Sequence, residues 1–352
     1  METNNILEIR NMTKDYDGKV VLKGISFNVH EGEFITLLGP SGCGKSTTIR
    51  IIGGFEKANS GEILFEGKNL APIKINKRQI NTVFQSYALF PNRTVWENIA
   101  FGLENKKMKR EIIDREVGKM VKLVGLEGHE DKKPNELSGG QRQRVAMARA
   151  LVMKPKILLL DEPMAALDVQ LRKVMRDELK RLQKEVGITF IMVSHDQEEA
   201  LTMSDRIVVM NQGIIQQIGT PEEIYNEPEN IWVSKFVGTS NVIEDGEFVR
   251  DHLVKFDGKE FKCMDTNFGE NEYNIDIVIR PEDVQVRKPN NGFFNGKITS
   301  ATFMGVHWEL IFETTKGRQW IIHTTDYHEP DEKVSIKWNE EAIHVMWKEV
   351  DD

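Results

Sequence analysis

Apolar positions along the first two thirds of the chain follow two periods. Short apolar runs at residues 34–38 and 157–160 are typical of buried strands. Longer segments repeat apolar residues every three or four positions, which predicts helices with one buried face. The clearest such stripe, which Gly187 would end, consists of Leu171, Val174, Met175, Leu179, Leu182 and Val186. Alternating strands and helices from residue 6 to about residue 236 predict an α/β domain.

The pattern changes after about residue 240. Short strand-like runs at 296–303, 308–312 and 320–325 are separated by Asn-Gly and Lys-Gly turn signals. A further run alternates in a way that predicts a half-buried strand: Ile275, Asp276, Ile277, Val278, Ile279 and Arg280. Several short strands with glycine turns indicate a small all-β barrel of the oligonucleotide/oligosaccharide-binding type. We therefore expect an α/β domain over residues 1–238 and a β-rich domain over residues 239–352.

Composition adds the expected compartment and excludes one class of partner. The chain has 352 residues and a formal net charge of -8, which argues against binding nucleic acid. Cys43 and Cys263 are far apart and lack metal-ligand spacing, so free thiols in a reducing compartment are expected. We find no apolar run of the roughly 18 residues needed to cross a bilayer and no signal-peptide pattern. We expect a cytosolic chain that reaches a membrane only through partners.

A phosphate-binding loop follows the apolar run at 34–38. Residues 39–46 read Gly-Pro-Ser-Gly-Cys-Gly-Lys-Ser, the form G-x-x-x-x-G-K-[ST]. The glycines let the loop turn its N–H groups toward phosphate oxygens. Lys45 is expected at the β- and γ-phosphates, and the Ser46 hydroxyl at Mg²⁺. The candidate ATP-binding residues of this region are Gly39, Ser41, Gly42, Cys43, Gly44, Lys45, Ser46 and Thr47.

Two carboxylates end the run at 157–160. Asp161 is placed to hold Mg²⁺ through water, and Glu162 is the candidate general base that orients the attacking water. Glu162 could instead be a carboxylate at a helix start, although the following Pro163 favours a fixed loop. Together with the phosphate loop, these residues predict a site for nucleotide hydrolysis.

The segment Ser138-Gly139-Gly140-Gln141 is expected to open a helix, with Ser138 as its N-cap. Behind a phosphate loop and before an acidic strand, the sequence L-S-G-G-Q resembles the ATP-binding-cassette (ABC) ATPases. The resemblance implies that Gln85 senses Mg²⁺ and the γ-phosphate, His195 contacts the γ-phosphate, and Thr47 binds the α-phosphate. It also implies that Tyr16 stacks on adenine.

The resemblance further implies a shared site. In these proteins the signature residues Ser138, Gly139, Gly140 and Gln141, with Asp168, bind ATP held by the opposite subunit. This chain has a single phosphate loop, so a second copy of itself is expected as partner. One position departs from the usual S-A-L-D: the run 164–168 reads Met-Ala-Ala-Leu-Asp. Ala165 therefore lacks a hydroxyl that would face the partner, and weaker coupling between the two sites is expected.

The whole chain resembles importer ATPases with a C-terminal regulatory (TOBE-type) barrel, most closely those for spermidine and putrescine. Segments 81–91, 52–56, 236–241 and 342–346 carry that likeness. It implies two membrane-embedded permease subunits, an extracytoplasmic substrate-binding protein, and a peripheral position on the cytoplasmic membrane face. Importers of sugar, iron or sulfate share the same chemistry, and a non-transport ABC ATPase is a third alternative. A permease-docking groove is expected near Tyr87, Leu89, Phe90 and Trp96, although core packing explains these residues equally well.

Overall fold

The computed structural model describes residues 4–165, 167–270 and 272–348. The chain divides into two compact units, Met1–Pro221 and Glu222–Asp352. The expected domain boundary at residues 238 and 239 stays a prediction. The division into units falls before it because helix α8 (Ile231–Val237) packs on strand β15 (Ile275–Ile279) of the second unit.

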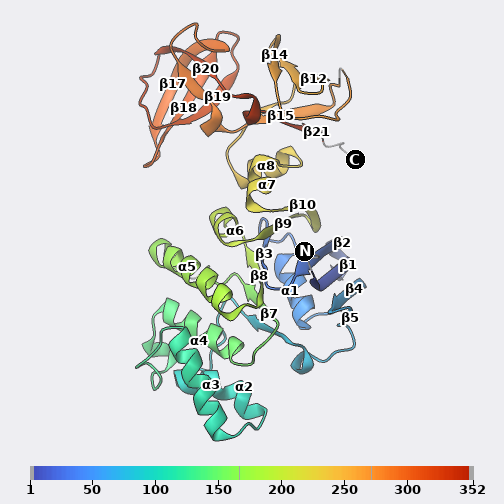
Figure 1. Cartoon of the computed structure of the whole chain (residues 1–352), viewed down its shortest axis with the longest axis vertical. Helices are drawn as coiled ribbons and strands as arrows, with labels where there is room; N and C mark the ends of the chain where they lie inside the picture. The colour runs from blue at the N-terminus through green and yellow to red at the C-terminus, as the bar shows by residue number, and fades with distance from the viewer. Residues whose placement is uncertain (1–3, 166, 271, 349–352) are drawn as a thin grey trace. The chain divides into compact units, whose positions relative to one another are not determined.

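A mixed sheet forms the centre of the first unit (Figure 1). Over the described residues its strand order is β10-β9-β3-β8-β7-β6. The strands are β3 (Phe34–Leu38), β6 (Ile80–Val83), β7 (Ile157–Asp161), β8 (Thr189–Ser194), β9 (Arg206–Asn211) and β10 (Ile214–Gly219). All neighbouring pairs are parallel except β9 with β10. Because parallel strands point the same way, loops after β3, β6, β7 and β8 meet at one edge of the sheet.

Both faces of this sheet are covered, which explains the continuous apolar runs. Ile157 and Leu159 of β7 face a core shared with helix α1 (Lys45–Gly53) and an antiparallel sheet in the order β2-β1-β4-β5. Leu158 and Leu160 face the opposite core, shared with helices α4 (Gly139–Leu151), α5 (Val169–Val186) and α6 (Gln197–Met203). The antiparallel strands are β1 (Asn5–Tyr16), β2 (Lys19–His30), β4 (Ser60–Phe65) and β5 (Lys68–Asn69).

A separate helical region holds the start of α4. Helices α2 (Val95–Asn105) and α3 (Arg110–Leu123) pack against α4 around their own apolar core. A short 3₁₀ turn at Pro134–Glu136 lies between α3 and α4, and another at Ile75–Lys77 lies between β5 and β6. The signature segment therefore opens a helix that belongs to the helical region at one end and to the sheet core at the other.

The expected stripe on α5 is correct except at one position. Met175, Leu179 and Leu182 are buried, and Gly187 caps the helix with a φ of 64°. Val174 is 49% exposed, so its place in the stripe was wrong. Each residue turns about 100° around a helix axis, which carries the position before Met175 away from the buried face.

The second unit is rich in β-structure (Figure 1). Its described residues pack around an apolar core. In the residues that the structure describes, its sheets have the orders β11-β15-β21, β12-β13-β14 and β16-β20-β17-β18-β19. Helix α7 (Pro221–Asn226) begins at the division between the units. The remaining strands are β11 (Asn241–Ile243), β12 (Glu247–Arg250), β13 (Leu253–Phe256), β14 (Lys259–Lys262), β16 (Gln285–Arg287), β17 (Phe294–Phe303), β18 (Trp308–Thr314), β19 (Gln319–Thr324), β20 (Lys333–Lys337) and β21 (His344–Trp347). Short 3₁₀ turns at Pro281–Asp283 and Glu340–Ala342 complete the unit.

The alternating run at 275–280 is not half-buried. All five residues of β15 are buried, and Arg280 after it is 5% exposed. Strand β15 lies between β11 and β21, and α8 packs on it, so neither its edges nor its faces reach solvent freely. Arg280 is satisfied there by the carbonyl oxygens of Tyr225, Ser234 and Thr239.

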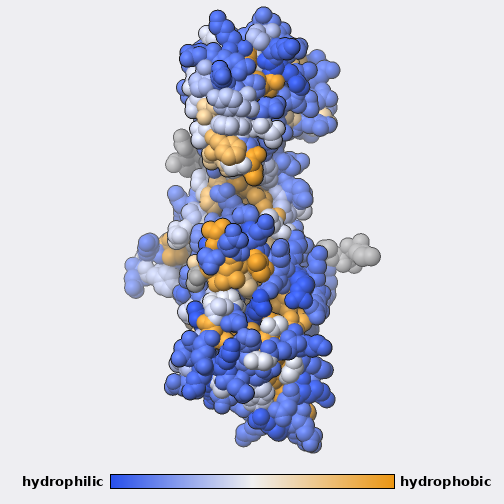
Figure 2. Space-filling view, turned by 90° about the vertical axis from the view of Figure 1, so that its left-hand side faces the viewer, coloured by the Kyte–Doolittle hydropathy of each residue, from blue (hydrophilic) through white to orange (hydrophobic). Residues whose placement is uncertain are grey.

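Apolar surface is limited on the face drawn in Figure 2, where orange patches are separated by hydrophilic side chains. Among the helices of the described residues, none combines the length and apolar character of a membrane span.

Candidate functional site

The loop after β3 is shaped by close backbone packing. A Cβ at Gly39 would lie 2.2 Å from the Met210 carbonyl oxygen, and one at Gly44 would lie 2.5 Å from Leu22 Cδ2. Gly44 also has a φ of 106°, a conformation that side chains rarely adopt. These two positions explain why this loop needs glycine. Helix α1 begins directly after Gly44, so its free N–H groups and positive dipole end face the loop.

Lys45 is held inside the loop that precedes it. Its ammonium donates hydrogen bonds to the carbonyl oxygens of Gly39 at 2.7 Å and Pro40 at 2.9 Å. The residue is 4% exposed, so its position is defined by these contacts. Ser41 and Gly42 are exposed at the loop tip, whereas Cys43 is buried. Burial raises the pKa of the Cys43 thiol, which keeps it protonated and unreactive.

Ser46 joins the loop to the end of β7. Its hydroxyl donates to Asp161 Oδ1 at 2.9 Å. Burial raises the pKa of the Asp161 carboxyl, and the Ser46 hydrogen bond and nearby Arg50 oppose that shift. A hydroxyl and a carboxylate in contact are hard oxygen ligands of the kind that Mg²⁺ prefers.

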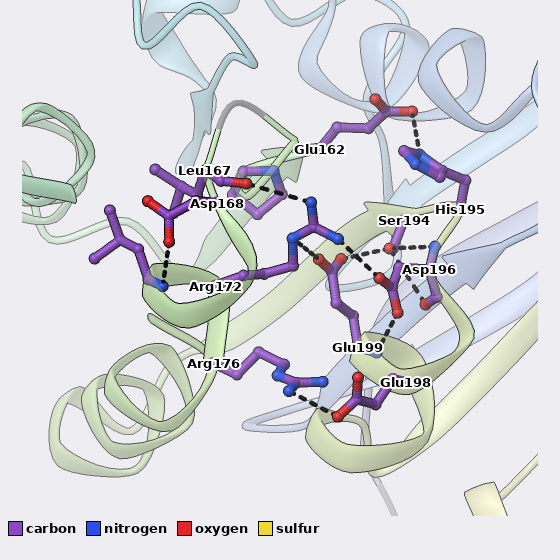
Figure 3. Close-up of polar contacts among 12 residues, drawn as sticks. Glu162, Leu167, Asp168, Arg172, Arg176, Ser194, His195, Asp196, Glu198 and Glu199 are labelled. Carbon is purple, nitrogen blue, oxygen red and sulfur yellow. Dashed lines mark hydrogen bonds and ion pairs between the residues drawn. The ribbon is translucent and has the colours of Figure 1, made fainter. Parts of the chain in front are cut away.

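Gln85, Glu162 and His195 come together, although the first and last are 110 positions apart in the sequence. They follow β6, β7 and β8, which are adjacent in the sheet. Gln85 Nε2 donates to Glu162 Oε2 at 3.3 Å. His195 Nδ1 lies 3.5 Å from Glu162 Oε1 (Figure 3). Glu162 has a φ of 46°, an uncommon conformation for a non-glycine residue. Its backbone N–H donates to the Val193 carbonyl oxygen of β8 at 3.2 Å, which fixes that conformation.

Tyr16 lies at the end of β1 beside the start of α1. Its phenol donates a hydrogen bond to Glu56, and the Thr47 hydroxyl also bonds to it. Burial raises the pKa of Tyr16, with a further rise from Glu56. The ring is 41% exposed and has the Lys14 ammonium 4.7 Å from its centroid. An exposed ring next to Thr47 is compatible with stacking on a base whose phosphates lie in the loop.

The signature segment has partners in the helical region. Ser138 caps α4: its hydroxyl accepts from the Gln141 N–H at 3.3 Å, and Gln141 Oε1 accepts from the Ser138 N–H at 2.9 Å. Gln141 Nε2 lies 3.1 Å from His129 Nε2. A Cβ at Gly139 would lie 3.2 Å from Leu167 Cδ2, so the segment packs on the chain that follows Glu162. Ser138 and the loop after β3 thus belong to different parts of the unit.

Asp168 begins the helix after the two carboxylates. It is exposed and accepts the Leu171 N–H at 2.9 Å through Oδ1, which caps α5 (Figure 3). Ala165 is also exposed. Ala166 lies outside the described residues. The departure at Ala165 therefore concerns a surface position, where an added hydroxyl could meet a partner.

A polar cluster beside His195 was not expected from the sequence. Arg172 reaches Asp196 Oδ2 at 3.1 Å, and Ser194 donates to buried Glu199 at 2.5 Å (Figure 3). Burial raises the pKa of the Glu199 carboxyl, and its bond from Ser194 opposes the shift. The sequence signal was weak, because Arg172 and Asp196 lie on different helices, 24 positions apart. Their closeness follows from the packing of α5 on α6.

Of the residues suggested for a permease groove, Tyr87 belongs to the core. It is 5% exposed and packs in the same cluster as Leu158 and Leu160 of β7. Leu89, Phe90 and Trp96 are partly buried. Leu89 and Trp96 pack against the core of the helical region. Their role in docking a permease stays a prediction.

Comparison with known proteins identifies both units. Residues 22–165 match the family model described as ABC transporter, and residues 277–346 match that of the TOBE domain. A protein of Mesoplasma florum named spermidine/putrescine import ATP-binding protein PotA is 72% identical over 99% of both chains. A protein of Clostridium novyi with the same name is 54% identical over 98% of both chains. The solved structure of cbiO1 from Clostridium perfringens, part of the ABC transporter complex cbiONQ, is 35% identical with a TM-score of 0.59, covering 66% of this chain and 93% of that one.

Proposed function

The chain belongs to the spermidine/putrescine import ATP-binding proteins of the ABC transporters, and we propose that two copies of it hydrolyse a shared pair of ATP molecules to drive polyamine uptake. As a member of this family it binds and hydrolyses ATP as the ATPase subunit of an importer, and it works with membrane permeases. Beyond this, we propose the dimer, the roles of the individual residues, the metal ion and the remaining partners.

One observation carries the dimer. Within the first unit, the phosphate loop shares the sheet edge with Gln85, Glu162 and His195, whereas Ser138 caps a helix of the helical region. The signature residues Ser138, Gly139, Gly140 and Gln141 would therefore serve a nucleotide held by the other copy, with Asp168 beside them. A helix N-terminus with an exposed capping serine is suited to an incoming phosphate. Each copy would supply its signature segment to the nucleotide site of the other copy.

Within one copy, the loop residues from Gly39 to Thr47 would bind the phosphates through N–H groups and the Lys45 ammonium. Tyr16 would stack on the adenine. Glu162 would hold the attacking water and accept its proton, because its carboxylate lies at the sheet edge between Gln85 and His195. His195 would donate a hydrogen bond to the γ-phosphate. The reaction converts ATP and water to ADP and phosphate.

Mg²⁺ fits the oxygen atoms that meet behind the phosphate loop. The residues that would hold it are Ser46, Asp161 through water, and Gln85. Among the described residues, no group of three or more His, Cys, Asp or Glu side chains is arranged to hold a metal ion. Mg²⁺ commonly keeps several waters and binds through one or two carboxylates and the substrate phosphates. When bound, the ion would neutralise phosphate charge during the transfer.

ATP binding can drive transport only if the closed dimer binds ATP better than the open one. The dimer would lie at the cytoplasmic face of the membrane, and its closure would change the conformation of the two permeases. An extracytoplasmic substrate-binding protein would deliver the cargo, so this subunit itself need not contact the polyamine. The C-terminal unit would help hold the two copies together while the nucleotide units open.

The function is tested by reconstituting the chain with its permeases and binding protein in vesicles. We expect ATP-dependent uptake of labelled spermidine or putrescine, and no uptake of maltose, sulfate or ferric iron by the same vesicles. ATP hydrolysis without polyamine uptake, but with uptake of one of the other solutes, would assign the chain to a different importer. Hydrolysis without any uptake would favour a non-transport ATPase.

Ala165→Ser tests the position that departs from the usual motif. We expect the added hydroxyl to strengthen contact across the dimer and to change the basal ATPase rate by about fivefold, because a single hydrogen bond contributes about 1 kcal/mol. The Hill coefficient for ATP should rise with it. Ala71→Ser, at another exposed alanine, is the control. Equal rates and Hill coefficients in wild type and Ala165→Ser would show that position 165 does not take part in coupling.

A further inference from the structure

Arg172 contacts two loops, one before α5 and one before α6, that have different roles in the proposed dimer. It lies in the first turn of α5, directly after the exposed cap Asp168. One guanidinium nitrogen, Nη2, donates to the Leu167 carbonyl oxygen at 3.3 Å, and the other, Nη1, donates to Asp196 Oδ2 at 3.1 Å (Figure 3). Leu167 precedes a residue that would face the partner's ATP, and Asp196 follows His195. The fork of Arg172 thus spans both loops.

The His195 side of this connection is a closed polar network. Asp196 Oδ1 caps α6 by accepting the Glu199 N–H at 3.1 Å, and the Asp196 N–H donates to Ser194 Oγ at 3.0 Å. Ser194 in turn donates to Glu199, whose side chain is 7% exposed and lies 3.9 Å from Arg172 Nε. His195 is enclosed between Ser194 and Asp196 in the sequence. A shift of Asp196 is therefore a shift of the backbone that carries His195.

We propose that Arg172 is a positioning residue that makes the placement of His195 in one copy depend on the contact of Leu167 and Asp168 with the other copy. This inference rests on the shared-site dimer proposed above. When the partner's nucleotide orders the chain around Asp168, the Leu167 carbonyl holds the guanidinium, and the guanidinium holds Asp196 and the turn at His195. Because both hydrogen bonds come from one rigid planar group, a displacement at one end is felt at the other. The bond to Asp196 is charge-assisted and is the stronger of the two.

The alternative is that Arg172 only fastens α5 to α6. Arg176 provides the matched comparison, because it lies one turn later on the same helix and also binds an α6 carboxylate, Glu198, at 2.8 Å. Neither Glu198 nor Arg176 adjoins His195 or Leu167 in the sequence. A fastening role predicts similar losses for both arginines, whereas coupling predicts a loss for Arg172 alone.

The test compares Arg172→Gln, Asp196→Asn and their double variant with Arg176→Gln in the full chain, with and without its permeases. Asp196→Asn keeps the helix cap, since asparagine caps as well as aspartate. For Arg172→Gln we expect kcat to fall about tenfold, a size typical of coupling positions, with KM for ATP little changed and the Hill coefficient near that of independent sites. The double variant should be no slower than the slower single variant, because both remove the same contact. Arg172→Lys should recover only part of the rate, because lysine cannot bind both oxygen atoms.

Equal kcat and Hill coefficients in Arg172→Gln and Arg176→Gln would overturn the inference. So would a fall in kcat accompanied by a larger drop in Tm than Arg176→Gln shows, since that result indicates fastening. Additive losses in the double variant would also contradict it. A wild-type chain that hydrolyses ATP as a strict monomer would instead overturn the proposed dimer, and the inference with it.

Discussion

Glu162→Gln is expected to reduce ATP hydrolysis by about 10²- to 10⁴-fold, the contribution of a general base, while leaving ATP binding intact. Glutamine keeps the size and the hydrogen-bonding contact with Gln85 but cannot accept the proton of the attacking water. The Lys45 loop and the Ser46–Asp161 contact lie on other elements and are unchanged. The enzyme should therefore bind ATP and stop before the chemical step.

An arrested chain should also change its association state. If ATP joins two copies and hydrolysis separates them, Glu162→Gln should accumulate as a dimer with ATP and Mg²⁺ and return to monomer or open dimer with ADP. Light scattering and size-exclusion chromatography measure this directly. Glu185→Gln is the control, because Glu185 forms an exposed pair with Arg181, a kind of contact that contributes little. A strictly monomeric Glu162→Gln protein at saturating ATP, alone and with its permeases, would contradict the shared-site dimer.

The sequence predicted that the candidate residues lie together, because they follow apolar strands that are neighbours in a parallel sheet; their roles toward a nucleotide stay predictions. Once the runs at 34–38 and 157–160 are taken as such strands, Lys45, Asp161 and Glu162 must lie at one edge. Gln85 and His195 follow two more strands of the same sheet, so the structure places them against Glu162 as well. In each case a short loop after a strand determines the position.

The misplaced residues depend on packing that no local pattern records. Val174 has the right spacing for the α5 stripe from Leu171, but the buried face of the helix turns away from it. The run from Ile275 to Arg280 has the alternation of a half-exposed strand, yet β15 is buried between β11 and β21 with α8 packed on it, and Arg280 finds carbonyl partners. Arg172 and Asp196 are ordinary charged residues of two amphipathic helices until α5 packs on α6. Contacts between elements that are distant in the sequence determine all three features: the exposure of Val174, the burial of β15 and the contact of Arg172 with Asp196. The sequence pattern indicates the elements but not these contacts.

Mixing two inactive chains should restore hydrolysis, which is the most direct test of a site built from two copies. Lys45→Ala removes the ammonium from the phosphate loop. Ser138→Asp keeps a good N-cap for α4 but places a carboxylate where the other copy's phosphate would lie. Each variant alone should lose at least about 10²-fold of its ATPase rate, the loss expected when transition-state charge is no longer stabilised.

In a mixed dimer, one site combines the intact loop of the Ser138→Asp chain with the intact signature of the Lys45→Ala chain. If the chains pair at random, about half of the dimers are mixed and each has one working site of two, so about a quarter of the wild-type rate should return. Ser138→Asn, neutral and equally able to cap the helix, should be less impaired than Ser138→Asp, which separates the effect of charge from that of helix stability. Tight coupling between the sites would lower the recovered rate but not abolish it. A mixture that stays as inactive as its components would mean that Ser138 serves the nucleotide of its own chain, because only then does no combination contain an intact site.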